Sequence, residues 1–92
     1  MSNVIYKYKL TGPATLLYLG EYDRVLSVGL QKDEFAVWVL KNLDFQPASK
    51  IVRIISINTG NEFELPEYSQ FLGTHQTSTG IVWHVFSYEQ HI

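Results

Sequence analysis

The chain has 92 residues and a mass of 10.6 kDa, which allows one domain over residues 1–92 and excludes two-lobed enzymes and α/β barrels. Hydrophobic residues make up 46% of the chain and charged residues 17%, so the composition is globular and excludes a disordered tail. The seven Lys and Arg residues are scattered and the formal charge is −2, so we do not expect binding to duplex nucleic acid.

The apolar residues recur with a period of two, which is the period of β-strands. This pattern predicts seven short strands, at residues 6–10, 14–19, 24–31, 34–41, 49–58, 70–76 and 81–87. Lys32-Asp33 separates the third strand from the fourth, and this two-residue spacing predicts a tight β-hairpin. The fourth strand is apolar on both faces, which is typical of a strand that is central and covered on both sides.

Short strands at roughly ten-residue spacing are typical of all-β folds. The predicted fold is therefore a small antiparallel sandwich or a partly open barrel of about seven short strands. The alternative is an α+β fold with one short helix over residues 13–22, although Gly20 and its β-branched and aromatic neighbours disfavour a helix. Residues 65–68 are also compatible with a single helical turn, with Pro66 near its start.

Aromatic residues are abundant for a chain of this length, with two Trp, six Tyr and five Phe. Apolar residues also occupy both faces of at least two predicted strands, and one small sandwich cannot bury all of them. Half-exposed tyrosines account for part of this excess, because folded surfaces are more than half apolar. The rest favours an oligomer interface or an aromatic ligand pocket, and we expect a homodimer or a larger assembly.

The chain has no cysteine, so disulfides and thiolate metal ligands are excluded, and we expect a reducing, cytoplasmic setting. Lys7 and Lys9 interrupt the first apolar segment, which therefore does not resemble a signal peptide. No apolar run approaches the roughly 20 residues of a membrane helix, so we expect no membrane association. No serine lies in a Gly-x-Ser-x-Gly elbow.

His75 and His84 lie on the two strands of the last predicted hairpin. Their side chains share a face if the loop has two residues and lie on opposite faces if it has three. Two imidazoles need a third ligand to hold a metal ion, and only Glu89 and His91, in the predicted tail, are weak candidates. We therefore predict no metal site, no cofactor and no catalytic residue.

Two arginines interrupt apolar strands: Arg24 opens the third predicted strand and Arg53 lies inside the fifth. A cation in such a place needs a carboxylate or a bound anion as its partner, because an unpaired charge is costly to bury. The carboxylates considered for salt bridges are Asp23, Glu62 and Glu64. The other partner considered is the phosphate of a small molecule.

The loop at residues 58–61 is the most ligand-like segment of the chain. Its backbone N–H groups and the side chains of Thr59 and Asn61 could donate to an anion or to the edge of a base. With the arginines and a stacking aromatic residue, they form a hypothetical site for a phosphorylated small molecule. The predicted ligand-binding residues are Arg24, Arg53, Thr59, Asn61 and Trp38.

Several segments resemble a family of short uncharacterised bacteriophage and prophage proteins with an Ile-Tyr-Lys-Tyr opening and a Trp-His-Val-Phe ending. The matching segments are Ile5-Tyr6-Lys7-Tyr8-Lys9-Leu10, Val25-Leu26-Ser27-Val28-Gly29-Leu30-Gln31, Thr59-Gly60, Leu72-Gly73-Thr74-His75-Gln76 and Val82-Trp83-His84-Val85-Phe86. The family loop continues Thr-Gly-His, and Asn61 replaces that His here, which weakens a metal or acid–base role for the loop. The resemblance implies a phage or prophage origin, and such small proteins often bind a host protein or sequester a host signalling nucleotide.

Three functional hypotheses follow. The first is a non-enzymatic phage accessory protein of the host cytoplasm that acts by binding as a homo-oligomer and antagonises host defence. Its partner would be a host protein or a small phosphorylated ligand. The second is a structural or assembly module, which predicts a large apolar patch. The third is a small hydrolase, which predicts that His75, His84 and a carboxylate meet in one cleft.

Overall fold

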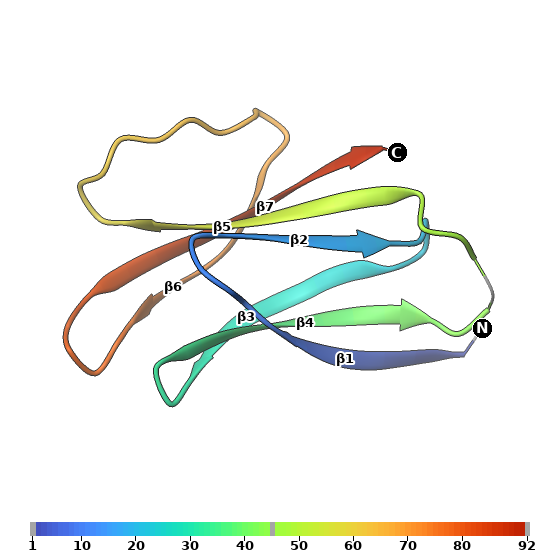
Figure 1. Cartoon of the computed structure of the whole chain (residues 1–92), viewed down its shortest axis with the longest axis horizontal. Coiled ribbons are helices and arrows are strands. Elements are labelled where there is room, and N and C mark those ends of the chain that lie inside the picture. Colours follow the sequence, from blue (N-terminus) through green and yellow to red (C-terminus); the bar gives the residue numbers. More distant parts are fainter. Residues whose placement is uncertain (1, 45, 92) are drawn as a thin grey trace.

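The computed structural model describes residues 2–44 and 46–91 (Figure 1). The strands are β1 (Asn3–Lys9), β2 (Ala14–Leu19), β3 (Arg24–Gln31), β4 (Glu34–Asn42), β5 (Lys50–Asn58), β6 (Gln70–Gln76) and β7 (Val82–His91). Neighbouring strands are antiparallel, and the described residues contain no helix. The predicted all-β fold is confirmed in its sandwich form, because the strands make two separate sheets instead of one closed barrel.

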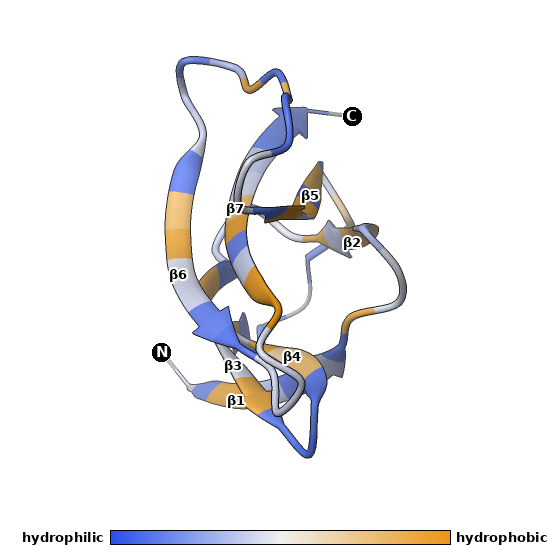
Figure 2. Cartoon of the chain, turned by 90° about the vertical axis from the view of Figure 1, so that its left-hand side faces the viewer, coloured by the Kyte–Doolittle hydropathy of each residue, from blue (hydrophilic) through white to orange (hydrophobic). Residues whose placement is uncertain are grey.

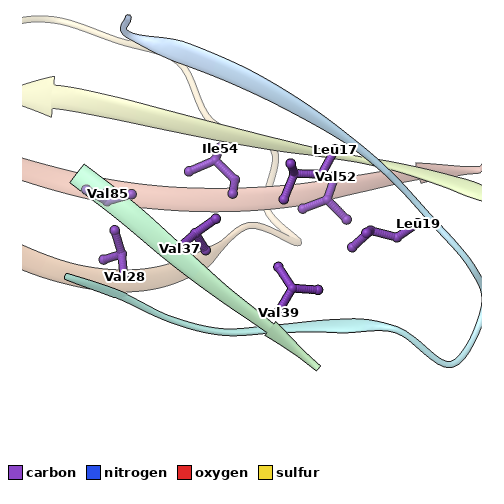
Figure 3. Packing of buried hydrophobic residues seen from close by; sticks show 8 residues of the cluster. All are labelled: Leu17, Leu19, Val28, Val37, Val39, Val52, Ile54 and Val85. Atoms are coloured by element: carbon purple, nitrogen blue, oxygen red, sulfur yellow. The ribbon is translucent and has the colours of Figure 1, made fainter. Parts of the chain in front are cut away.

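The two sheets pack face to face. Sheet A has the strand order β1-β4-β3 and sheet B the order β2-β5-β7-β6, and Figure 2 shows sheet A below sheet B. Small aliphatic side chains fill the space between them (Figure 3): Leu17, Leu19, Val28, Val37, Val39, Val52, Ile54 and Val85. None of the described aromatic residues is fully buried. Tyr8 and Phe35 pack against the margin of the aliphatic core, whereas other rings, such as Tyr18 and Phe71, lie exposed on the outer face of sheet B.

The alternative of a helix over residues 13–22 is wrong, because this segment contains β2, an edge strand of sheet B. Leu17 and Leu19 are buried in the core, whereas the intervening Tyr18 is exposed. This alternation has the period of a strand, and pairing with β5 satisfies its backbone groups. The segment 65–68 forms a turn in place of the predicted helical turn, and the Ser69 N–H donates to the Pro66 carbonyl at 3.0 Å.

β4 is the central strand of sheet A, as its two apolar faces predicted. On its inner face Val37 and Val39 are completely buried. On its outer face Trp38 and Leu40 are only half-buried, so this side is not covered by a further layer. Trp38 lies over β3, where a Cβ added to Gly29 would come within 2.9 Å of its ring.

The β3–β4 hairpin has the predicted two-residue turn. Lys32 and Asp33 both adopt left-handed backbone conformations, with φ of 51° and 62°, as a type I′ turn requires. The Asp33 carboxylate accepts a hydrogen bond from the Ser78 N–H at 2.9 Å and a second from the Ser78 hydroxyl. These bonds lower the pKa of Asp33 and tie the hairpin of sheet A to the β6–β7 loop of sheet B.

A buried carboxylate joins the sheets at the opposite end of β3. Asp23 is fully buried and accepts hydrogen bonds from the Gly20 N–H at 2.9 Å and the Asn42 N–H at 2.8 Å. It also accepts from Lys41 Nζ at 2.6 Å and from Gln46 Nε2 at 3.0 Å. One side chain therefore fixes the end of β2, the end of β4 and the β4–β5 connection, all of which lie at the right of Figure 1.

Lys50 completes this cluster. Its ammonium group donates to the Asp23 carbonyl at 2.7 Å and forms an ion pair with Glu89 at 3.3 Å. Burial raises the pKa of the Asp23 carboxyl, but hydrogen bonds from Lys41 and from the N–H groups of Asn42 and Gly20 outweigh burial and leave it below its ordinary value of 3.8. The charged form of Asp23 is therefore the form that stabilises the fold.

Replacing Asp23 with Asn should lower the free energy of unfolding at pH 7 by about 3 kcal/mol, because Lys41 then loses its buried partner. The folded-state pKa is depressed, so the stabilisation is present above the unfolded value of 3.8 and is lost as the pH falls through the lower folded value. Urea unfolding at neutral and acidic pH should show the gap between wild type and Asp23→Asn narrowing in acid. Asp44→Asn, on an exposed carboxylate, is the control, and equal stability of Asp23→Asn and wild type at pH 7 would refute the assignment.

Replacing Asp33 with Asn should loosen the contact between hairpin and loop without changing the turn, because Asn tolerates left-handed backbone. The substitution removes the charge that strengthens the bonds from Ser78. We expect faster hydrogen exchange at the Ser78 amide, measured by NMR. Glu34→Gln removes the neighbouring charge and should leave the exchange at Ser78 unchanged; equal acceleration in both variants would contradict the role of Asp33.

Candidate functional site

The five predicted ligand-binding residues lie on separate surfaces. Trp38 lies on the outer face of sheet A and Arg53 on the outer face of sheet B, on opposite sides of the sandwich. Thr59 and Asn61 lie in the β5–β6 connection, and Arg24 lines a cleft at the side of the sandwich. The structure therefore does not bring all five to one place.

Neither arginine forms an ion pair with a described carboxylate. Arg53 donates from Nε to Gln90 Oε1 at 2.9 Å. Asp23 precedes Arg24 in the chain but points to Lys41 and the surrounding N–H groups. The Arg24 guanidinium makes no hydrogen bond or ion pair with any residue in the described part of the chain, so all its donors are available to an external acceptor.

The cleft at Arg24 has a volume of about 390 Å³ and lies between the start of β3 and the adjoining parts of β6 and β7. Its mouth is lined by Arg24, Leu26, Tyr68 and Gln70. Val52 and Ser87, both buried, reach it from the inner face of sheet B. The Tyr88 ring contacts the Tyr68 ring edge to face, with centroids 6.3 Å apart. The cleft thus combines a free cation, two tyrosines, neutral polar groups and the carboxylate of Glu89, which is paired with Lys50 at 3.3 Å.

β-Bulges in two facing strands accompany this cleft. The register of β3 shifts between Val25 and Ser27, and that of β6 shifts between Phe71 and Gly73. Beyond the second bulge the strands approach each other, since a Cβ on Gly73 would lie 3.5 Å from the Val28 side chain. Bulges bend a strand and re-aim its side chains, so the edges of the two sheets separate at the Arg24 end.

A second pocket of about 480 Å³ lies at the end of the sandwich that carries the β3–β4 hairpin. Leu10, Phe35 and Trp83 supply apolar walls, and the Phe35 and Trp83 rings meet edge to face at 6.4 Å. The charged groups at its rim are already satisfied. Lys9 pairs with Glu34 at 3.0 Å, and Asp33 accepts from Ser78. This pocket therefore offers no free charge to a ligand.

The two strand histidines lie on opposite faces of sheet B, which is the second of the two predicted arrangements. His75 faces inwards and packs edge to face on Phe35 at 5.9 Å. His84 faces outwards, with the Thr59 hydroxyl 2.6 Å from Nε2 and the Thr74 hydroxyl 3.0 Å from Nδ1. Among the described residues, no carboxylate bonds to either imidazole and no three potential metal ligands cluster. The trio that the hydrolase hypothesis requires is not assembled.

The loop residues are placed poorly for an anion. The Thr59 hydroxyl is engaged with His84, so it anchors the start of the loop to β7. Asn61 borders a shallow hollow that Glu62 and Glu64 also line. Two carboxylates beside Asn61 repel a negative ligand. Of the five predicted residues, Arg24 alone combines a free cation with a defined cleft.

The outer face of sheet B carries apolar side chains from all four strands, and we call this surface the B face. Its residues are Leu16, Tyr18, Ile51, Arg53, Ile55, Ile57, Phe71, Phe86 and Tyr88. Leu16, Arg53 and Tyr88 lie opposite one another on neighbouring strands. Leu16 is 41% exposed and Tyr18 61%, so the β2 side of this face is open to solvent.

Aromatic rings cluster on the part of the B face that β6 and β7 form. Phe86 contacts Phe71 with ring centroids 5.4 Å apart and Phe63, from the β5–β6 connection, at 5.8 Å. Tyr88 borders this cluster and also lines the cleft at Arg24. The B face and the cleft therefore share one residue, Tyr88.

Sequence reasoning missed Tyr68, Gln70 and Tyr88 as neighbours of Arg24. These residues are distant from Arg24 in the sequence, and the bulges that set their position leave no clear local pattern. Tyr88 was also missed because β7 continues to His91, beyond the predicted end at Ser87, and pairs with β5 over this extension.

Residues 2–44 and 46–91 contain no helix that could cross a bilayer. No curated protein and no solved structure matches the chain significantly. One family model does match, and it covers residues 1–92, the whole of the sandwich described above. The chain thus belongs to the family described as Domain of unknown function (DUF7352).

Proposed function

We propose that this chain is a non-enzymatic binding protein that works as a homodimer, with the B face as the contact surface. The observation that carries the proposal is the continuous apolar surface over the four strands of sheet B, with Arg53 between Leu16 and Tyr88. Aromatic residues and arginine are the residue types enriched in the centres of protein interfaces. The core is filled by aliphatic side chains, so the exposed aromatic residues are not required to close it.

The area of the B face is large enough for an interface with a second copy of the chain. The four strands have six to ten residues each. At about 3.3 Å per residue and about 4.8 Å between strands, they give a face of about 510 Å². Two such faces in contact bury about 1,000 Å², which is the area that a specific interface needs. In a twofold dimer each face meets its own copy, so the aromatic and arginine side chains of one B face would contact those of the other.

The resemblance of several motifs to bacteriophage and prophage proteins supports a finer version of this proposal. In that version the dimer acts in the cytoplasm of a host cell and antagonises host defence by holding a host protein or a signalling nucleotide. The apolar side chains of the B face also support the second candidate, a structural or assembly module, which predicts a large apolar patch. The hydrolase receives no such support, because His75 and His84 lie on opposite faces of sheet B.

Sedimentation equilibrium at micromolar concentration should give twice the 10.6 kDa mass of the chain. Leu16→Glu and Tyr18→Glu should each raise the dimer dissociation constant at least about tenfold, because each buries a carboxylate in an apolar contact. Both side chains are largely exposed in the single chain, so the variants should fold.

Ile5→Glu is the matched control for these two substitutions. Ile5 is 56% exposed but lies on the outer face of sheet A, so this variant should remain a dimer. A monomeric wild type, or equal dissociation of Ile5→Glu and Leu16→Glu, would disprove the assignment of the B face.

A further inference from the structure

We propose that the cleft at Arg24 binds a small molecule in which a phosphate monoester is attached to a planar ring. Arg24 would hold the phosphate, and the ring would lie against Tyr68 and Tyr88. This proposal does not depend on the dimer, because the cleft is complete within one chain. It rests on the charge balance, the shape and the polar lining of the cleft.

The charge balance leaves one cation without a partner. Asp23 is paired with Lys41 at 2.6 Å, and Glu89, which lines the cleft, is paired with Lys50 at 3.3 Å. These two pairs cancel, whereas the Arg24 guanidinium has no partner among the described residues. With Lys50 offsetting Glu89 from behind the lining, Arg24 is the charge at the cleft that remains uncompensated, in a chain whose formal charge is −2. An anion is the ligand that this arrangement favours.

The type of cation specifies the anion further. A guanidinium presents parallel N–H groups that match two oxygens of a phosphate or carboxylate. Nothing in the described part of the chain occupies those donors, so a ligand does not have to displace an internal bond. Glu89 stands at the cleft as well, and its pairing with Lys50 reduces its repulsion of the incoming anion.

The rest of the cleft suits a flat, partly polar ring. Tyr68 is 65% exposed and leans edge to face on Tyr88, so a ring face is open to stacking. Stacking on an aromatic side chain contributes to the binding of any base, because every base has a π-face. The polar edge of such a ring could bond to the side-chain amide of Gln70, which offers both donors and an acceptor, and to the Ser87 hydroxyl. A volume of about 390 Å³ falls within the usual range for small-molecule sites.

The two β-bulges indicate that the cleft is built into the fold. They occur in β3 and β6, the strands that face each other across it, and each lies within four residues of Arg24 or Gln70. Bulges are over-represented beside binding sites, where they re-aim side chains. The apolar pocket at the hairpin end shows the contrast, because its Lys9 is neutralised by Glu34 and it offers no charge for a phosphate.

NMR titration tests the site with adenosine 5′-monophosphate as the probe and with adenosine and inorganic phosphate as its two halves. We expect the monophosphate to bind at least about tenfold more tightly than either half, with shifts at Arg24, Gln70 and Ser87. Titration of the Leu16→Glu variant keeps the result independent of self-association. An absence of shifts up to about 10 mM monophosphate, or equal affinity for adenosine, would overturn the proposal.

Arg24→Gln should weaken the binding of the monophosphate about tenfold to hundredfold, which is the usual contribution of a hydrogen bond to a charged group. Arg24→Lys keeps the charge but loses the paired N–H donors of the guanidinium, so its affinity should lie between those of wild type and Arg24→Gln. Lys32→Gln is the matched control, because it removes an equal charge from the exposed hairpin turn, away from both the cleft and the B face, and it should bind as wild type does. Equal losses in Arg24→Gln and Lys32→Gln would mean that general charge attraction, and not the cleft, holds the probe.

Tyr68→Leu gives a second line of evidence that does not touch the cation. The side chain is exposed, so the variant should fold. The substitution should weaken the binding of the monophosphate several-fold and leave the affinity for inorganic phosphate unchanged, because only the ring contact is removed. Unchanged affinity for the monophosphate would show that the ring does not lie on Tyr68 and would refute this part of the site.

Discussion

Asp23 accepts hydrogen bonds from the β2–β3 connection, from the end of β4 and from the β4–β5 connection, so the two sheets are joined through its carboxylate. The core between the sheets consists of small aliphatic side chains, and such a core constrains the relative orientation of two sheets only weakly. Directional bonds supply the missing constraint. Asp23 acts at one end of β3, and the Asp33–Ser78 contact acts at the other.

This division of roles explains where the aromatic residues lie. The fully buried core consists of Leu, Val and Ile, and the ends are closed by polar contacts, so no ring is needed at its centre. Phe63, Phe71 and Phe86 contact one another at the B face, and Tyr68 contacts Tyr88 at the cleft. About half of the aromatic residues of the chain thus lie at these two surfaces.

Local patterns predicted the strands well, because alternation and turn residues act over short stretches. The turn at Lys32-Asp33 and the bounds of β2, β3 and β6 follow from the residues alone. The order of strands within each sheet and the bulge at Leu26 depend on contacts between distant segments, so they had no local signal. The same holds for the site. Arg24 was singled out as a cation in an apolar strand, but its freedom depends on Asp23 turning towards Lys41.

Tyr88 connects the proposed dimer with the proposed ligand site. The residue belongs to the B face and also lines the cleft at Arg24, so self-association and ligand binding would involve the same residue. Two equilibria that share a group are thermodynamically linked, and the linkage is reciprocal. A ligand that fixed Tyr88 in the orientation of the dimer would strengthen the dimer by the same factor by which dimerisation would strengthen ligand binding. One side chain would then be sufficient for the occupancy of the cleft to set the assembly state of the protein.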